Sequence, residues 1–140
     1  MNLTGTWKLV GWRRIADDGT VTYPLGEDAH GLLVYTANGR MIVQLAAADR
    51  PKLDTADALG GDVQARADAY STCLAYFGTY EVDGDTVIHR VDSSLFPNWS
   101  GAEQARPYTY DGHELVLRTP PVTGPNGTVV NELAWAREEA

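Results

Sequence analysis

The sequence predicts an all-β protein, an antiparallel up-and-down barrel of about eight strands with one short helix inserted mid-chain. Two observations support this prediction. Runs rich in β-branched and aromatic residues recur along the 140-residue chain, and Asn-Gly or Asp-Gly pairs separate several of them. Closure into a barrel removes the edge strands that an open sheet of this length would expose. Because the length is typical of one domain, we expect residues 1–140 to form a single barrel domain.

The expected strands follow the alternation of apolar and polar residues. "ANG" at 37–39, "DGD" at 83–85 and "DG" at 111–112 mark three hairpin turns, because Asn, Asp and Gly tolerate the positive φ of tight turns. The strands are expected at residues 5–15, 31–36, 40–47, 76–82, 86–92, 105–110, 113–119 and 128–137.

The segment between the third and fourth strands departs from the β pattern. β-branched residues become rare there, and Asp62 is a suitable N-cap. Val63, Ala67 and Tyr70 recur near one helical face. We expect one helix over residues 62–72.

Charge and composition exclude several classes of partner. The formal net charge of −8 at pH 7 opposes binding to nucleic acid and anionic lipid, and no basic cluster exceeds Arg13-Arg14. No run approaches the roughly 18 apolar residues of a membrane span, and the N-terminus lacks the pattern of a secretory signal. Cys73, the single cysteine, allows no intramolecular disulfide and is expected to be packed and inert. We expect a cytoplasmic protein that binds neither nucleic acid nor membranes.

The sequence also lacks the common signatures of metal, nucleotide and nucleophile sites. His30, His89 and His113 are far apart, and no His or Cys spacing resembles a zinc site. Ser93 and Ser94 lie in no Gly-x-Ser-x-Gly elbow, and "GEDAHG" lacks the Lys of a phosphate-binding loop. No metal or other cofactor is expected.

Strand pairing predicts which side chains line the barrel interior. If "DGD" closes its hairpin, Tyr80 lies opposite His89 and Val82 opposite Val87, all on one face. His89 therefore points inward beside Tyr80. A buried histidine needs hydrogen-bond partners, which a structural network or a bound ligand would supply.

In the next hairpin, closed at "DG", Leu115 and Leu117 mark the interior face. The expected register pairs Tyr110 with His113, Tyr108 with Leu115, and Arg106 with Leu117. The inward set of this hairpin is thus Gln104, Arg106, Tyr108, Leu115 and Leu117. An interior cation without an acidic partner is a natural receptor for a carboxylate, enolate or polarised carbonyl.

Two further regions complete the expected interior and surface. On the first strand, Trp7 and Leu9 share a face with Arg13, which would point inward near the open mouth. Trp12 would then lie on the outer face, where it suits a self-association surface of a homodimer. The loop "LFPNWSG" offers Phe96, Asn98 and Trp99 as a plug over the core or as a wall of the cavity, extended by Tyr35, Tyr70 and Tyr76.

The chain ends and several interior stretches resemble a known family. "GTW" at 5–7 is similar to the Gly-x-Trp motif of lipocalins, and "WAR" at 135–137 supplies the arginine that packs on that Trp at the closed end of the barrel. "YPLGEDAHGLLVYTANGRM", "AYFGTYEV", "HRVDSSLFPNWSG" and "QARPYTYDGHELVL" together resemble the bacterial and fungal lipocalin-like domain family. The resemblance implies a small barrel with a cavity, a Trp7–Arg137 pair, and either ligand binding or cyclase or isomerase chemistry of natural-product pathways.

Two hypotheses for function remain open at this point. In the first, a cofactor-free enzyme cyclises, isomerises or dehydrates a hydrophobic, carbonyl-bearing metabolite of polyketide or terpenoid type. His89 would act near neutral pKa as general acid or base, Tyr80 would orient it or relay a proton, and Arg106 would stabilise negative charge. In the second, the protein is a carrier or sensor that releases a small hydrophobic ligand unchanged. A third outcome is a purely structural network around His89.

Overall fold

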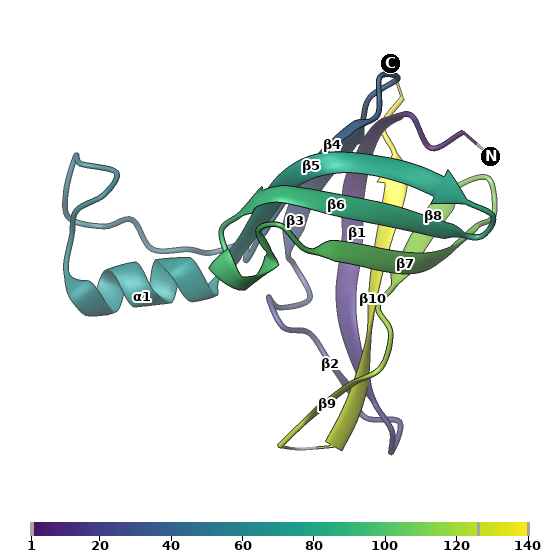
Figure 1. Ribbon diagram of the computed structural model, residues 1–140. Helices are drawn as coiled ribbons and strands as arrows, with labels where there is room; N and C mark the ends of the chain where they lie inside the picture. The colour runs from purple at the N-terminus through teal and green to yellow at the C-terminus, as the bar shows by residue number, and fades with distance from the viewer. Residues whose placement is uncertain (1, 126, 140) are drawn as a thin grey trace.

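Eight antiparallel strands close into a barrel in the computed structural model, which describes residues 2–125 and 127–139 (Figure 1). The chain order around the barrel is β1-β3-β4-β5-β6-β7-β8-β10, and pairing of β1 with β10 closes it. The barrel strands are β1 (Gly5–Ala16), β3 (His30–Tyr35), β4 (Arg40–Ala46), β5 (Cys73–Asp83), β6 (Thr86–Ser94), β7 (Glu103–Tyr110), β8 (Glu114–Arg118) and β10 (Gly127–Arg137). Short strands β2 (Val21–Thr22) and β9 (Val122–Gly124) pair antiparallel with the end of β1 and the start of β10, and η1 (Pro97–Trp99) follows β6. The all-β barrel prediction is confirmed.

The β5–β6 hairpin has the expected register. Tyr80 pairs with His89 and Val82 with Val87, and the three inner residues Val87, His89 and Val91 are buried. His89 thus reaches the interior because the period of two along β6 places it there.

The β7–β8 hairpin has a different register from the one expected. Tyr110 pairs with Leu115 instead of His113, and Tyr108 pairs with Leu117. Asp111 Oδ1 accepts the backbone N–H groups of His113 and Glu114 at 2.9 and 2.7 Å, which makes the loop longer than a two-residue turn. The shift equals two residues, so every side chain keeps its predicted face.

A β-bulge in β1 contradicts two expectations about its second half. Leu9 pairs with Trp135 and Gly11 with Ala134, so Val10 is an extra residue that reverses the alternation. Trp12 is therefore half-buried on the inner side instead of exposed, and the proposed homodimer surface loses its anchor. Arg13 points outward, where it pairs with Glu132.

The closed end of the barrel contains the predicted Trp7–Arg137 pair. Trp7 is fully buried, and its indole N–H donates to the Leu3 carbonyl at 2.9 Å. The guanidinium of Arg137 lies 4.2 Å from the Trp7 ring centroid and donates to the Thr4 carbonyl at 2.6 Å. Gly5 has a φ of +138°, a conformation that other residues rarely adopt, and a Cβ there would lie 2.8 Å from that guanidinium, so glycine is favoured. Both chain ends lie at this end of the barrel (Figure 1).

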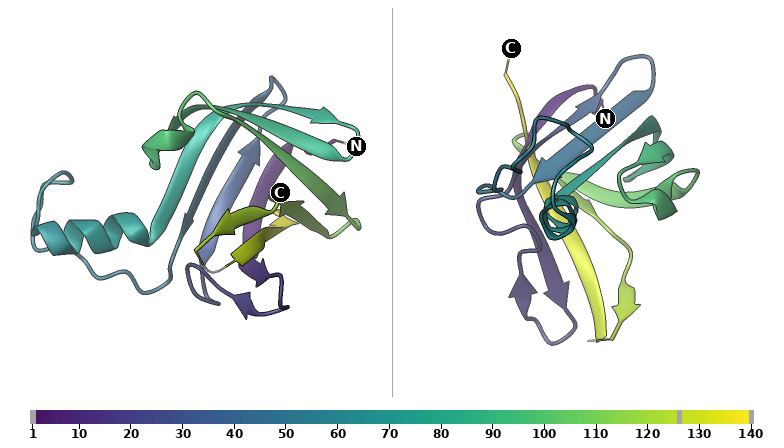
Figure 2. Two further views of the ribbon diagram at one scale, coloured as in Figure 1. Left: turned by 60° about the horizontal axis from the view of Figure 1, so that its bottom comes forward. Right: turned by 90° about the vertical axis from the view of Figure 1, so that its left-hand side faces the viewer.

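Helix α1 (Val63–Ser71) begins after the predicted cap, since Asp62 accepts the N–H groups of Gln64 and Ala65. The helix extends away from the barrel, together with the loop before it (Figures 1 and 2). It contains no buried residue, and Val63 and Tyr70, expected on a packing face, are 72% and 46% exposed. No helix in the described part of the chain has the length and apolar character needed to cross a membrane.

Candidate ligand-binding cavity

The barrel encloses a cavity of about 660 Å³ that opens at the end opposite Trp7 and Arg137. Of the predicted site residues, it brings together Tyr76, His89, Phe96, Trp99, Gln104, Arg106 and Leu117. The other five predicted residues do not line it: Tyr35, Tyr80, Tyr108 and Leu115 pack in or against the core, and Asn98 is exposed in η1. Tyr70 of α1, which was also expected to extend the cavity wall, lines the mouth of the cavity.

His89 lies between two tyrosine hydroxyls. Tyr35 Oη from β3 is 2.6 Å from Nε2, and Tyr76 Oη from β5 is 2.9 Å from Nδ1. Both ring nitrogens of the 1% exposed histidine therefore have hydrogen-bond partners inside the barrel. We name this Tyr35–His89–Tyr76 arrangement the Tyr–His–Tyr chain.

The numbers of donors and acceptors on these three side chains indicate which group donates in each hydrogen bond of the Tyr–His–Tyr chain. A neutral imidazole has one N–H donor and one acceptor nitrogen. We assign the Tyr35 hydroxyl as the donor to His89 Nε2, because Tyr35 is 1% exposed and an unsatisfied buried donor is costly. The Nδ1–H of His89 then donates to Tyr76 Oη. The hydroxyl hydrogen of Tyr76 remains available to a group in the cavity.

The electrostatic environment keeps the chain uncharged. Burial, reinforced by the positive charge of Arg106, lowers the pKa of His89 from 6.5 to about 3. Burial raises the pKa of Tyr76 to about 12, and the pKa of Tyr35 also lies well above its ordinary value. The near-neutral pKa expected for His89 is therefore wrong, because desolvation disfavours the imidazolium.

Tyr80 has partners other than the predicted one. Although it is the cross-strand neighbour of His89, its hydroxyl donates to the Thr36 carbonyl at 2.9 Å and lies 3.3 Å from Thr4 Oγ1. Its ring packs against Tyr35 with centroids 4.4 Å apart. Tyr80 thus supports the chain through Tyr35 and makes no hydrogen bond to His89 itself.

Arg106 supplies the positive charge of the cavity. Its Nη2 donates to Gln104 Oε1 at 2.8 Å, and both side chains come from the inner face of β7, as predicted. Its positive charge lowers the pKa of His89 further and partly offsets the rise that burial causes in the pKa of Tyr76. Burial also lowers the pKa of Arg106 itself. Within the described residues no carboxylate pairs with Arg106. Glu103, the one carboxylate among the described lining residues, pairs with Arg90 instead.

The aromatic loop after β6 packs against Tyr76 of the Tyr–His–Tyr chain and forms one wall of the cavity. Trp99 meets Tyr76 edge-on with centroids 5.7 Å apart, and Phe96 meets Trp99 at 5.4 Å. Both loop aromatics are half-buried and line the cavity. Such edge-to-face contacts orient rings well, so Tyr76 is held on two sides.

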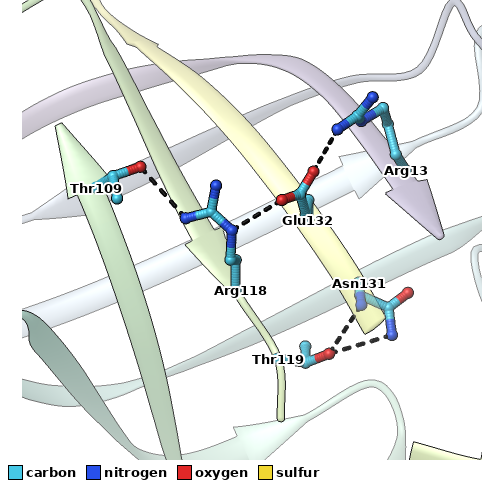
Figure 3. A network of polar contacts seen from close by, with 6 residues as sticks. All are labelled: Arg13, Thr109, Arg118, Thr119, Asn131 and Glu132. Carbon is cyan, nitrogen blue, oxygen red and sulfur yellow. Dashed lines mark hydrogen bonds and ion pairs between the residues drawn. The ribbon is translucent and has the colours of Figure 1, made fainter. Parts of the chain in front are cut away.

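The mouth contains residues that the sequence interpretation missed. Asn131 Oδ1 accepts the indole N–H of Trp12 at 2.8 Å and the Nε–H of Arg14 at 3.1 Å, and all three line the cavity. Asn131 is hydrogen-bonded to Thr119, which directly follows β8, and the next residue, Glu132, lies on the other face between two arginines (Figure 3). The alternation of β10 could have indicated Asn131, but Trp12 and Arg14 depend on the bulge.

Trp135 is a second cavity residue that was not predicted as such. It is 1% exposed, and its indole N–H has no hydrogen-bond partner among the described residues. Metal-ligating side chains do not gather in threes anywhere in the described part of the chain. The groups that can meet a ligand are therefore hydrogen-bond donors and acceptors, two arginines, Arg14 at the mouth and Arg106, and apolar side chains.

Comparison with known proteins agrees with this architecture. The search of curated proteins found no match. Among solved structures, a mutant of the fluorescent protein UnaG is similar over 96% of this chain and 95% of that one, with 13% identity and a TM-score of 0.39. The model of the lipocalin-like domain family matches residues 4–138. Nearly the whole chain is thus covered, and the protein belongs to the lipocalin-like domain family.

Proposed function

We propose that the barrel binds a small hydrophobic metabolite with a carbonyl or carboxylate oxygen placed between Tyr76 and Arg106. We further propose that it promotes, without a cofactor, a reaction in which negative charge develops on that oxygen, cyclisation above all. The observation that carries the proposal is the convergence of the Tyr76 hydroxyl and the Arg106 guanidinium on one largely apolar cavity.

The two donors suit an oxygen that gains charge. A phenol and a guanidinium in a largely apolar cavity stabilise an enolate or alkoxide more than they stabilise the neutral carbonyl. Because the donors are held by Gln104, His89 and Trp99, little reorganisation is needed when the charge appears. This is the electrostatic preorganisation that distinguishes the transition state from the substrate.

His89 acts in this proposal as a positioning residue. Both of its nitrogens are engaged by tyrosines, and its pKa of about 3 makes it a weak base at neutral pH. The role of general acid or base therefore passes to Tyr76, which can donate its hydrogen to the developing oxyanion. Polarisation of a carbonyl, followed by ring closure within a folded chain, fits these groups better than proton abstraction by the histidine.

A carrier or sensor is the second candidate, and the low pKa of His89 favours it. A chain of neutral donors beside one cation is equally suited to hold a carboxylate without changing it. The same residues would then contribute to affinity alone.

The test begins with native mass spectrometry of the purified protein incubated with a metabolite extract of its source cells. The wild type is compared with Tyr76→Phe and Arg106→Met, and with Arg13→Met as the control on the outer face. For an enzyme, a compound is converted, and Tyr76→Phe lowers turnover by about 100-fold or more with affinity within a few-fold.

Other results identify the alternatives. A compound recovered unchanged, whose binding both cavity variants weaken, establishes the carrier. His89→Ala separates the histidine roles, since a positioning residue affects turnover less than Tyr76→Phe does. Conversion or binding that survives both cavity variants contradicts the proposed anchor.

A further inference from the structure

Trp135 presents the one unexplained polar group of the interior. Its indole N–H is the single buried side-chain nitrogen or oxygen, among the residues described, that lacks a hydrogen-bond partner. An unsatisfied buried donor costs about 1 to 3 kcal/mol, and such groups are rare in folded proteins. Two other indoles have partners within the protein, since Trp7 donates to the Leu3 carbonyl and Trp12 donates to Asn131.

The surroundings of Trp135 are apolar and lie deep in the barrel. On β10 it pairs with Leu9 of β1 on one side and with Leu115 of β8 on the other. Atoms of its side chain line the cavity, but the indole nitrogen itself has less than 1 Å² of accessible surface. A ligand oxygen can therefore meet the N–H only if the neighbouring side chains move apart when the ligand binds.

The position of Trp135 differs from that of the Arg106 anchor. Leu115, its neighbour, pairs with Tyr110, which is four residues beyond Arg106 on β7. At 3.3 Å per residue, four residues correspond to about 13 Å along the strand. This offset separates the two backbone positions, so a ligand that contacts both side chains extends along the cavity and is apolar between its two oxygens.

We propose that Trp135 is a second anchor of the cavity, which donates its indole N–H to a ketone or other acceptor oxygen near the apolar end of the ligand. The inference rests on the proposed function, since Arg106 holds the other end. The ligand class is accordingly a hydrophobic acid or enolisable ketone with a second, uncharged acceptor oxygen far from the first. An aliphatic chain without that oxygen leaves the donor unsatisfied and binds less tightly.

The test uses dodecanoate and its keto derivatives, with the ketone moved stepwise along the chain. Affinities are measured by calorimetry for the wild type, Trp135→Phe and Arg106→Met. We expect at least one keto isomer to bind the wild type about fivefold more tightly than dodecanoate, and Trp135→Phe to bring the ratio of the two affinities to about one.

A spectroscopic readout keeps the test independent of the variants' stability. In a proton–nitrogen correlation spectrum of the wild type, the preferred keto isomer should move the Trp135 indole proton downfield, and dodecanoate should not. Trp7, already bonded to Leu3, is the internal reference. If Trp135→Phe does not fold, substitution of the other three tryptophans assigns the resonance by elimination.

The contradicting outcomes are distinct for the two proposals. Equal affinity for dodecanoate and every keto isomer, with an unmoved Trp135 resonance, overturns the second anchor and leaves the Arg106 anchor standing. A keto preference that persists in Arg106→Met, with dodecanoate affinity unaffected by that variant, overturns the Arg106 anchor and retains Trp135. If no probe binds the wild type, both anchors are overturned.

Discussion

At the closed end of the barrel Trp7 is fully buried and bonded to Leu3, whereas helix α1 beside the open end buries no residue at all. At the closed end, the Arg137 guanidinium stacks on the Trp7 ring, and Tyr110 packs edge-on against the same ring. The helix extends into solvent and touches mainly the start of β5 (Figure 2). Buried side chains and hydrogen bonds between distant parts of the sequence therefore stabilise the closed end. The open end has fewer such contacts and can admit a ligand.

The largest expected effect follows from removing the centre of the closed end. Trp7→Ala should lower the free energy of unfolding by about 3 to 5 kcal/mol, because it deletes a fully buried indole and the surface on which Arg137 stacks. Urea unfolding measures the change. Trp99→Ala, in the half-buried loop at the mouth, is the matched control and should cost less. A loss below about 1 kcal/mol for Trp7→Ala would contradict the contrast between the ends.

The second effect is a dependence of stability on pH through His89. Its folded pKa of about 3 lies below its unfolded value near 6.5, so the unfolded state binds the proton first. The contribution of His89 to the free energy of unfolding is complete above the pKa of the unfolded state. It falls as the pH decreases toward the pKa of the folded state. The slope approaches about 1.4 kcal/mol per pH unit.

His89→Gln isolates this dependence from that of the carboxylates. The free energies of unfolding of wild type and variant are measured from pH 7 to the acid range, and their difference should shrink as the pH falls. Glu132 and the other acids titrate alike in both proteins, so their contribution cancels. Parallel curves would show that the histidine is not desolvated.

Arg106 provides an intermediate effect that separates binding from stability. Arg106→Met should weaken dodecanoate binding by about 10- to 100-fold, the scale of one lost charged hydrogen bond. Stability should stay constant or rise, since a buried cation without a carboxylate partner is replaced by an apolar chain. Calorimetry and urea unfolding measure the two quantities. Arg13→Met, on the outer face, should leave binding unchanged, and equal losses in both variants would count against the anchor.

The smallest effect is expected at the open end. The Ala47 N–H donates to the Thr72 carbonyl at 3.0 Å, and Ala46 pairs with Cys73. Residues 48–71 can therefore be replaced by an Asn-Gly turn that continues the β4–β5 hairpin. The free energy of unfolding should stay within about 1 kcal/mol of the wild type, since α1 buries no residue. A larger loss by urea unfolding would show that the helix supports the barrel.

Sequence periodicity predicted much of the interior. His89, Gln104 and Arg106 reach the cavity because two residues per repeat place them on the apolar face of β6 and β7. The Trp7–Arg137 pair followed from the family resemblance. The β7–β8 register was wrong by two residues, yet the faces survived because that error preserves the alternation.

The errors occurred where a single residue or a distant neighbour decides the outcome. Val10, the extra residue of the β1 bulge, moves Trp12 and Arg14 inward and Arg13 outward, and no local pattern marked it. The partners of His89 come from β3 and β5, so only the closed barrel could show that Tyr35 and Tyr76 replace Tyr80.

The sequence by itself determined the eight barrel strands, the β3–β4 and β5–β6 hairpin turns, the capped helix and the inward positions of His89, Gln104 and Arg106, because these depend on local periodicity and turn chemistry. Only the tertiary structure decided which hydroxyls meet His89, how far burial lowers its pKa, and that the Trp135 donor is left without a partner. Those properties depend on contacts between strands far apart in the chain and on exclusion of water, which arise when β1 and β10 close the barrel.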